Sequence, residues 1–202
     1  MSILKVILTV CFLGIVIPER VAGRELVDLE EAMPGILVDL RYASAKNIVG
    51  RPIYRDGRAR LRPQAVTRLK MVQEKLRRSG LQLIIWDAYR PPWAQEELWK
   101  AFPNPQFVAP PKPGSRHSRG TSVDVGLADL SGRPVEVPTD HDVFSPLADH
   151  DFSDLPKGAR QHAEKLRRAM FDSGWSGVPD EWWHYDLRNW REYSMIKQTK
   201  PN

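Results

Sequence analysis

The spacing of apolar residues predicts three helices in the chain after residue 60. Residues 63–80 place four apolar side chains at helical intervals on one face: Ala65, Leu69, Val72 and Leu76. Pro63 and Gly80 suit the beginning and the end of this helix, because proline is tolerated in the first turn and glycine is common just after the last. Residues 92–102 and 156–173 predict two more helices, and the second of these is followed by Gly174.

Three shorter apolar segments predict strands between and after these helices. Residues 81–86 form a β-rich apolar run that is too brief for another helix, residues 121–127 alternate, and residues 182–187 predict a last strand. The proline-rich segment 102–114 predicts a loop, since each proline lacks an N–H and has a restricted φ. The whole pattern predicts an α+β fold: a single compact domain with a small, mostly antiparallel sheet flanked by helices.

Composition and charge narrow the class of protein. The chain has 202 residues, of which 42% are hydrophobic and 27% charged, as expected for one globular domain with its own core. Its formal net charge is +5. The basic residues fall largely on predicted helix faces, for example within 68–78 and 165–168, which favours a solvated surface that suits an anionic envelope. We therefore predict no nucleic-acid partner.

The N-terminus predicts a secretory signal peptide. Lys5 precedes an apolar run of about twelve residues and then the small residues that end at Gly23, the predicted cleavage site. Residues 1–23 would be the leader and 24–202 the catalytic domain, secreted or periplasmic, with no stable membrane span after cleavage because the run is too short to cross a bilayer. A buried or membrane-surface helix, or a lipoprotein processed at Cys11, is the alternative. Without the leader the chain has no cysteine and hence no thiol nucleophile.

Four residues late in the chain suggest a catalytic metal site at the sheet. His117 and Asp124 lie on one predicted loop and strand, while Glu181 and His184 lie three positions apart near the last strand. Two imidazoles and one carboxylate leave the fourth position of a tetrahedral zinc ion open, as in catalytic sites. A nearby free glutamate can take a proton from water. The pattern therefore predicts metal-assisted hydrolysis.

This hypothesis has a geometric requirement and a structural alternative. In a regular strand Glu181 and His184 would point to opposite faces, so the site needs a bend or bulge near Trp182, or Glu181 just before the strand. The alternative is a capped surface histidine, a strand-end aspartate and an aromatic core strand. Other hydrolase and nucleotide-binding chemistries are not favoured, since no Gly-x-Ser-x-Gly, Gly-x-x-x-x-Gly-Lys or Gly-x-Gly-x-x-Gly motif is present.

Several motifs together resemble a known family. Ser-x-His-Ser-Arg-Gly-x-x-x-Asp at 115–124 and Glu-Trp-Trp-His-Tyr at 181–185 are similar to motifs of the zinc D-alanyl-D-alanine dipeptidases of the VanX type, relatives of the D,D-carboxypeptidases. Asp-Leu-Arg-Tyr-Ala at 39–43 and Trp-Asp-Ala-Tyr-Arg-Pro at 86–91 resemble further motifs of that family. With Asn47 and Gly50, which follow the block at 39–43, five such blocks occur in the same order across roughly residues 26–193.

The resemblance implies a role for each matching residue of the metal site. His117, Asp124 and His184 would hold one Zn²⁺ per chain, and Glu181 would be the general base. Arg90 would stabilise the negative charge that develops on the substrate oxygen, a task that suits a planar and permanently charged guanidinium. Without the resemblance, an arginine before a proline is typical of a surface ion pair.

The resemblance also implies a substrate-binding set. Asp142 matches the aspartate that meets the substrate ammonium, and Tyr42 and Ser115 match further contacts, with Ser115 at the carboxylate. Loop and N-cap hydrogen bonds are the alternative roles for these side chains, and Asp140 competes as the ammonium partner. His141 stands where the family usually has an aromatic residue, and its polar loop predicts a position at the rim of the site.

The predicted activity is hydrolysis of the free dipeptide D-Ala-D-Ala to D-alanine, in cell-wall dipeptide turnover or recycling. The leader argues against a role in glycopeptide resistance, which needs the dipeptide to be removed in the cytoplasm. Two rival functions remain: a D,D-carboxypeptidase or endopeptidase acting on longer peptidoglycan peptides, and a non-catalytic wall-binding module. Asp142 counts against the first and Glu181 against the second. The sequence predicts no oligomeric state.

Overall fold

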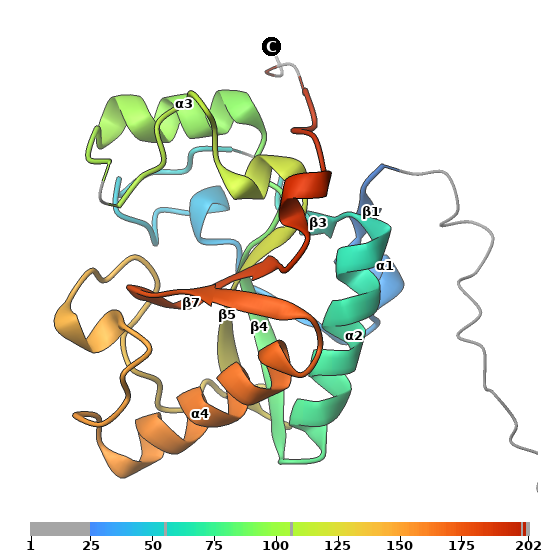
Figure 1. The fold of residues 1–202 in the computed structure, drawn as a ribbon, viewed down its shortest axis with the longest axis vertical. Coiled ribbons are helices and arrows are strands. Elements are labelled where there is room, and N and C mark those ends of the chain that lie inside the picture. The colour runs from blue at the N-terminus through green and yellow to red at the C-terminus, as the bar shows by residue number, and fades with distance from the viewer. Residues whose placement is uncertain (1–24, 55, 106, 199, 201–202) are drawn as a thin grey trace, which may run out of the picture.

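The computed structural model describes most of the chain after the predicted leader: residues 25–54, 56–105, 107–198 and 200. The signal-peptide prediction concerns residues 1–23, which lie outside the described residues, and it stays a prediction. The described part forms a five-stranded sheet with helices around it (Figure 1). Its strands follow the order β2 (Leu37–Val38), β4 (Leu81–Asp87), β5 (Ser122–Asp129), β7 (Glu181–Leu187) and β6 (Trp175–Val178).

The pairing of the strands confirms the predicted sheet. Only β2 and β4 run parallel, while the pairs β4–β5, β5–β7 and β6–β7 are antiparallel. A second, two-stranded sheet joins β1 (Val27–Asp28) to β3 (Arg60–Leu61). The fold is thus α+β with mixed sheets, as the alternation of short strands and helices predicted.

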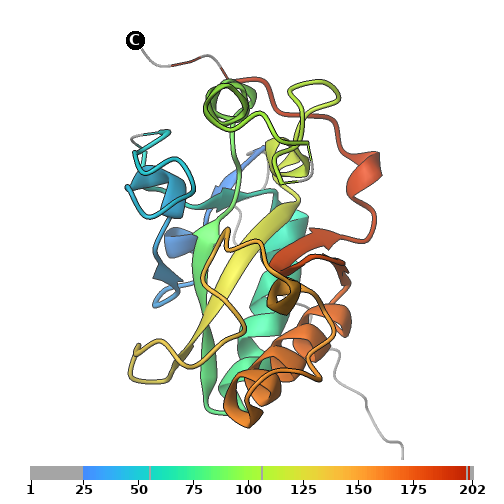
Figure 2. The same ribbon diagram turned by 90° about the vertical axis from the view of Figure 1, so that its left-hand side faces the viewer.

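The predicted helices form at the predicted places. Helix α2 (Pro63–Arg77) and helix α4 (Lys157–Phe171) contact each other and cover one side of the sheet (Figure 2). Helix α3 (Pro92–Ala101) lies apart from them, at the end of the sheet where β4 stops. The apolar face predicted for the first helix is buried: Ala65, Leu69, Val72 and Leu76. Helical periodicity therefore identified the core-facing side correctly.

Short elements complete the fold around the sheet. A single-turn helix, α1 (Leu29–Ala32), follows β1 and is capped by the side chain of Asp28. The remaining helical turns are of the tighter 3₁₀ type, which is used in short pieces: η2 (Arg41–Ala43), η3 (Arg116–Arg119), η4 (Pro146–Ala148) and η5 (Trp190–Glu192).

A bulge in β4 determines which side chains meet at its end. Ile85 pairs with Val125, but the next paired residue is Asp87, which lies opposite Asp124, so Trp86 is an extra residue on β4. Such bulges turn the following side chains and are common beside active sites. Here the bulge places Asp87 opposite Asp124, a candidate metal ligand.

A second irregularity occurs in β7, where the metal hypothesis required one. Tyr185 pairs with Gly177 of β6, and Glu181 pairs with the next residue, Val178. One step along β6, from Gly177 to Val178, therefore corresponds to four steps along β7, from Tyr185 to Glu181, so β7 is distorted between these two residues. Glu181 is also the first residue of the strand, and its Oε2 atom lies 3.7 Å from Nδ1 of His184. The predicted distortion is confirmed, and it brings the two side chains together.

Gly126 on β5 is required by the packing of Trp86. A Cβ atom at position 126 would lie 2.2 Å from a ring carbon of Trp86, whose side chain is buried. We expect Gly126→Ala to lower the free energy of unfolding by about 2 kcal/mol, since a buried ring cannot move freely to make room. Urea unfolding measures this. Gly57→Ala is the matched control, because a Cβ there meets no atom within 4 Å and stability should be unchanged.

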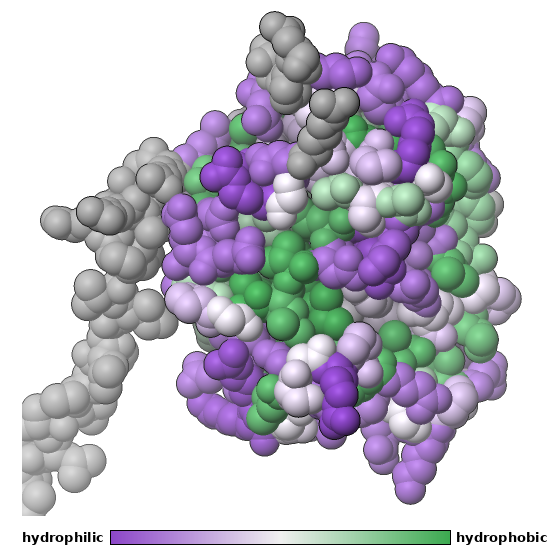
Figure 3. Space-filling view, turned by 180° about the vertical axis from the view of Figure 1, so that it is seen from behind, coloured by the Kyte–Doolittle hydropathy of each residue, from purple (hydrophilic) through white to green (hydrophobic). Residues whose placement is uncertain are grey.

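The surface of the described residues is mixed. Seen from behind, an apolar area is enclosed by polar side chains (Figure 3), as on many proteins, whose surfaces are largely apolar by area. Among the described residues, none of the helices has the length and the apolar character that crossing a membrane would need.

Candidate active site

Three predicted ligands meet where β5, β7 and the turn η3 approach one another. The Nε2 atom of His117 lies 3.1 Å from Nδ1 of His184 and 3.4 Å from Oδ1 of Asp124. The same Asp124 oxygen lies 2.9 Å from Nδ1 of His184. All three side chains are buried. Asp124 and His184 are paired residues on neighbouring strands, so the sheet register itself places two of the three ligands side by side.

In each imidazole, the nitrogen that points away from the other two candidate ligands has an oxygen partner, and this partner determines which nitrogen carries the hydrogen. Nδ1 of His117 lies 2.8 Å from the carbonyl oxygen of Ala88, and Nε2 of His184 lies 3.0 Å from Oδ1 of Asp186. Both oxygens can only accept, so each of these nitrogens donates. In the neutral rings, Nε2 of His117 and Nδ1 of His184 therefore present lone pairs.

These two lone pairs and a carboxylate oxygen of Asp124 converge on one small space. Three electron-rich atoms within 3.4 Å of one another repel unless a cation lies among them. In a tetrahedral zinc site with bonds of about 2.0–2.1 Å, the ligand atoms are about 3.3–3.4 Å apart. The donor set therefore fits zinc: two neutral imidazoles, each oriented by a hydrogen bond from its other nitrogen, and one carboxylate.

Glu181 lies beside the three candidate ligands and does not belong to their cluster. Its side chain is about a fifth exposed and contributes to the wall of the same pocket as His117, Asp124 and His184. Burial raises the pKa of Glu181 above its ordinary value, and the negative charges of Asp124 and Asp142 act in the same direction, while His184 opposes them. A carboxylate that gains a proton more readily than usual suits a group that takes and returns one.

Arg90 is held rigidly at the edge of the pocket. Its Nε and Nη2 atoms donate to Oδ2 of Asp87 at 2.9 and 2.6 Å, and Nη1 donates to Gln95 at 2.8 Å. Its guanidinium carbon also lies 4.5 Å from the centre of the Tyr42 ring. A guanidinium has five N–H groups, and these contacts engage three of them. The charge is thus buried, paired and oriented; Nη2 also lies 4.0 Å from Oδ2 of Asp124, and the side chain lines the pocket.

The predicted substrate-binding residues also line the pocket, on two of its sides. The hydroxyl of Tyr42 donates to Oδ2 of Asp142 at 2.8 Å. Asp142 has a positive φ of 58°, a conformation that aspartate tolerates better than most residues. Ser115 caps η3, since its Oγ accepts from the backbone N–H of His117, and it lines the pocket as well. Ser115 therefore forms the N-cap hydrogen bond and also lines the pocket, so the two roles are compatible.

The structure alters two expectations about the residues just before Asp142: the rim position of His141 and the role of Asp140 as an ammonium partner. The side chain of His141 is fully buried, with Nε2 3.0 Å from Oδ2 of Asp124, so the prediction of a rim position is wrong. The ring fits among aromatic neighbours that no local sequence pattern reveals. Asp140 instead binds Arg41 at 3.0 Å and is largely exposed, so it competes poorly as an ammonium partner.

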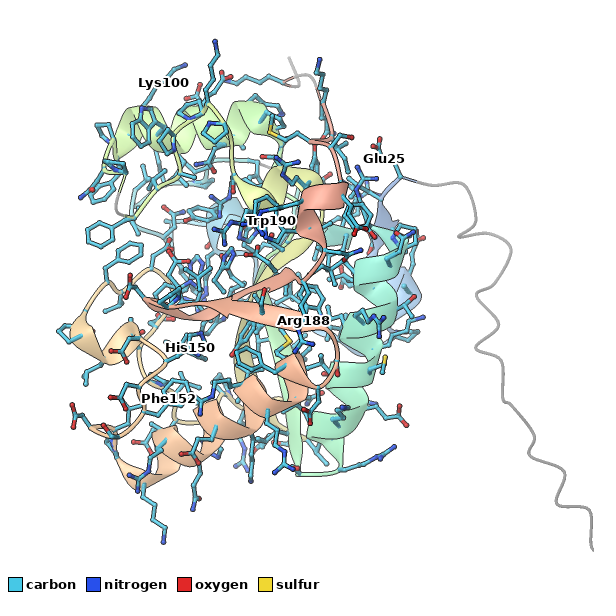
Figure 4. The ribbon with its side chains drawn as sticks, viewed as in Figure 1. Glu25, Lys100, His150, Phe152, Arg188 and Trp190 are labelled. Atoms are coloured by element: carbon cyan, nitrogen blue, oxygen red, sulfur yellow. The ribbon has the colours of Figure 1, made fainter. Side chains whose placement is uncertain are left out.

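The pocket around these groups has a volume of about 430 Å³. Its lining includes the candidate ligands and Glu181, and the proline-rich segment adds further lining residues: Pro105, Phe107, Ala109, Pro110, Pro113 and Gly114. Trp183 of β7 and Trp190 of η5 contribute aromatic walls; Trp190 lies beyond the end of β7 in Figure 4. Arg116 and Arg119 lie against the Trp190 ring, so the pocket has a basic side.

Sequence reasoning missed the residues that orient the site. Asp87 binds Arg90, Gln95 binds Arg90 from α3, and Asp186 binds His184. Asp186 could have been identified, because residues 184 and 186 share one face of a strand. Although burial favours its neutral form, His184, Ser122 and Arg116 hold the pKa of Asp186 well below its usual range. Asp87 and Gln95 depend on the β4 bulge and on the placement of α3, which no local pattern shows.

Fold and site together define a metal-dependent hydrolase: three buried candidate ligands, a carboxylate beside them and an arginine that lines the same pocket. A family profile described as Peptidase_M15, D-ala-D-ala dipeptidase, matches residues 22–199. The chain therefore belongs to this peptidase family, as its motifs predicted.

Individual relatives have the same family name. The D-alanyl-D-alanine dipeptidase of Escherichia coli K12 is 37% identical over 172 residues, which cover 85% of this chain and 89% of that protein. The D-alanyl-D-alanine dipeptidase of Streptomyces coelicolor is 29% identical, over 79% of this chain and 90% of its own length. Among solved structures, a vancomycin resistance D,D-pentapeptidase VanY in complex with Zn(II) aligns with a TM-score of 0.43 and 17% identity, over 66% of this chain and 75% of that one.

Proposed function

We propose that this chain hydrolyses the free dipeptide D-Ala-D-Ala to two molecules of D-alanine with one zinc ion per chain. The observation that supports it most is the convergence of His117, Asp124 and His184 on one space, with Glu181 next to them and Arg90 in the same pocket. Family membership supports the substrate, since two relatives that align over most of their length are D-alanyl-D-alanine dipeptidases.

The residues around the metal position divide the chemical work. When bound, zinc polarises water and the scissile carbonyl. Glu181 takes the proton of the attacking water and later returns it to the leaving amine. The guanidinium of Arg90 would meet the negative charge that develops on the carbonyl oxygen, and the pair with Asp87 holds it in place beforehand. Ala88 and Asp186 keep the two imidazoles oriented.

Asp142 supplies the group that would distinguish a dipeptide from a longer peptide. Burial raises its pKa, although His141 and Tyr42 oppose this, so its charge is incompletely compensated in the pocket. A free substrate ammonium would provide the missing positive charge, whereas an acylated nitrogen would not. Ser115 lines the same pocket as basic Arg116, which supports a role for Ser115 at the substrate carboxylate.

We expect Asp142→Asn to raise KM for D-Ala-D-Ala by about tenfold to a hundredfold with a smaller effect on kcat. The amide keeps the size of the side chain and removes the charge, and the expected rise in KM corresponds to a loss of about 1.4–2.8 kcal/mol of attraction to the ammonium. Steady-state kinetics separates the two constants. Asp140→Asn on the same loop is the control, and equal effects of both variants would contradict the assignment of Asp142.

A comparison of two substrates tests the proposed function. The purified chain with zinc is given free D-Ala-D-Ala or an N-acylated peptide that ends in D-Ala-D-Ala, and released D-alanine is measured. Hydrolysis of the free dipeptide alone supports the proposal. Preferential hydrolysis of the acylated peptide would assign the chain to D,D-carboxypeptidase activity, and release from neither would overturn the proposal.

Export through a cleaved leader is part of the same proposal. The basic start, apolar run and small residues before position 24 support it. An exported enzyme would meet dipeptide released from the cell wall, which favours turnover or recycling. The N-terminal residue of the protein recovered from the envelope or the medium tests this: Arg24 as the first residue is expected, and an intact Met1 would contradict export by cleavage.

A further inference from the structure

His141 contacts a candidate zinc ligand directly, from a loop that also carries Asp142. Its Nε2 atom lies 3.0 Å from Oδ2 of Asp124. The other oxygen of this carboxylate, Oδ1, faces His117 and His184 at 3.4 and 2.9 Å. The two oxygens of Asp124 therefore have different neighbours: one is directed to the metal position and the other to His141.

The chemistry of the contact determines its direction. An ionised carboxylate only accepts hydrogen bonds, so Nε2 of His141 carries the hydrogen and donates it to Asp124. Hydrogen bonds to a charged acceptor are the stronger kind, and this one lies in a fully buried place. It orients the carboxylate, because rotation that turns Oδ1 away from the metal position would break it.

The ring of His141 has little freedom to move. It lies against three aromatic rings with centroid distances of 5.6 Å to Tyr42, 5.8 Å to Trp86 and 5.8 Å to Trp183. A packed aromatic ring donates from a defined point at a small cost in conformational entropy. The contact with Asp124 is therefore a preorganised one, independent of any substrate.

His141 also borders the substrate end of the pocket. Its Nδ1 atom lies 3.3 Å from Oδ2 of Asp142, the next residue in the chain. The left-handed backbone of Asp142 lets two consecutive side chains reach the same interior, whereas neighbours in an extended segment point to opposite sides. The loop is further attached by Thr139, whose hydroxyl accepts from Trp182 at 3.0 Å.

We propose that His141 is a positioning residue that orients Asp124 for zinc binding and, through its ring, sets the place of Asp142 in the substrate pocket. The proposal has a zinc half, the orientation of Asp124, and a substrate half, the placement of Asp142. Only the substrate half rests on the proposed function. The zinc half depends only on the donor geometry of this chain. His141 contacts neither the metal position nor the reacting atoms, and it acts through its two aspartate neighbours.

The test compares zinc affinity, in the absence of substrate, among three variants of His141. His141→Gln keeps an N–H donor at about the same reach, His141→Met has a similar length without a donor, and His141→Phe keeps a ring without a donor. Competition with a chromophoric chelator measures the affinity of the metal-free protein. We expect the Met and Phe variants to bind zinc about tenfold to a hundredfold more weakly, as for other partners of ligating groups, and Gln to stay within about threefold of the unchanged chain.

The Gln and Met pair keeps the test decisive if the Phe variant does not fold, which a melting curve would show. Zinc affinity that is equal in all variants, or as weak in Gln as in Met, would overturn the zinc half. Asp140→Asn, which loosens the same loop at Arg41, should leave zinc affinity unchanged; a loss equal to that of Met would assign the effect to the loop instead.

Kinetics addresses the substrate half separately. At saturating zinc, His141→Met should raise KM for D-Ala-D-Ala at least about threefold, and Gln should restore it. An unchanged KM in the Met variant would overturn the substrate half. If the unchanged chain binds zinc but does not hydrolyse the dipeptide, the proposed function fails while the zinc comparison still decides the role of His141.

Discussion

Glu181→Ala is expected to lower kcat for D-Ala-D-Ala by about a thousandfold while the chain still binds zinc. A positioned general base contributes on the order of 10²–10⁴ to the rate. Glu181 lies 3.7 Å from His184 and lines the pocket without belonging to the three ligands that converge on the metal position. Removal of its carboxylate therefore takes away the proton acceptor and leaves the donor set intact.

Steady-state kinetics and the metal content of the dialysed protein measure the two parts of this result. Glu181→Gln tests the role of the charge with little change in shape and should behave like the alanine variant. Glu164→Ala, on the exposed side of α4, is the control and should leave both quantities unchanged. A near-normal rate in Glu181→Ala with zinc retained would remove Glu181 from the mechanism.

His184→Ala is expected to weaken zinc binding at least about a hundredfold, and activity should disappear with the metal. The substitution leaves His117 and Asp124 as the two remaining ligands, and zinc sites of this type use three protein ligands. It also removes one of three partners of Asp186, whose carboxylate would stay buried beside Arg116 and Ser122. Metal content after dialysis, and chelator competition, measure the loss.

A graded series makes this result specific. Asp186→Asn keeps all three ligands but weakens the hydrogen bond that orients His184, so an intermediate loss of about tenfold to a hundredfold is expected. His162→Ala is the histidine control, since His162 on α4 bonds the carbonyl oxygen of Glu136 and is no part of the ligand set. Unchanged metal content in His184→Ala would take this residue off the ligand set.

Elements with many regularly spaced residues were predictable from the sequence. α2 was predicted over residues 63–80 and spans Pro63–Arg77, and the apolar run at 81–86 became β4. The short elements β1, β2 and β3 have two residues each, too few for any period to be visible. They form because a neighbouring strand is present, not because of a local preference.

The candidate site also has a part that the sequence predicted and a part that it did not. Motif spacing identified His117, Asp124, Glu181 and His184, since their residue types carry metal and proton chemistry. It also showed that β7 needed a distortion, and the register shift at Gly177 and Val178 confirms it. The sequence does not show where that shift and the Trp86 bulge occur. Their locations depend on the residues of the neighbouring strand that lie opposite, and these residues are distant in the chain.

By itself the sequence determined the class of chemistry, the main helices and strands and the residues able to hold zinc, because residue type and short-range periodicity are local properties. Tertiary structure alone decided how these groups are oriented. Asp87 binds Arg90 because of a bulge, Ala88 orients His117 from a segment 29 residues earlier, and His141 is buried against Asp124 rather than lying at a rim. The physical reason is that orientation comes from packing and pairing between segments distant in sequence, where a buried polar group stays only if it finds a partner.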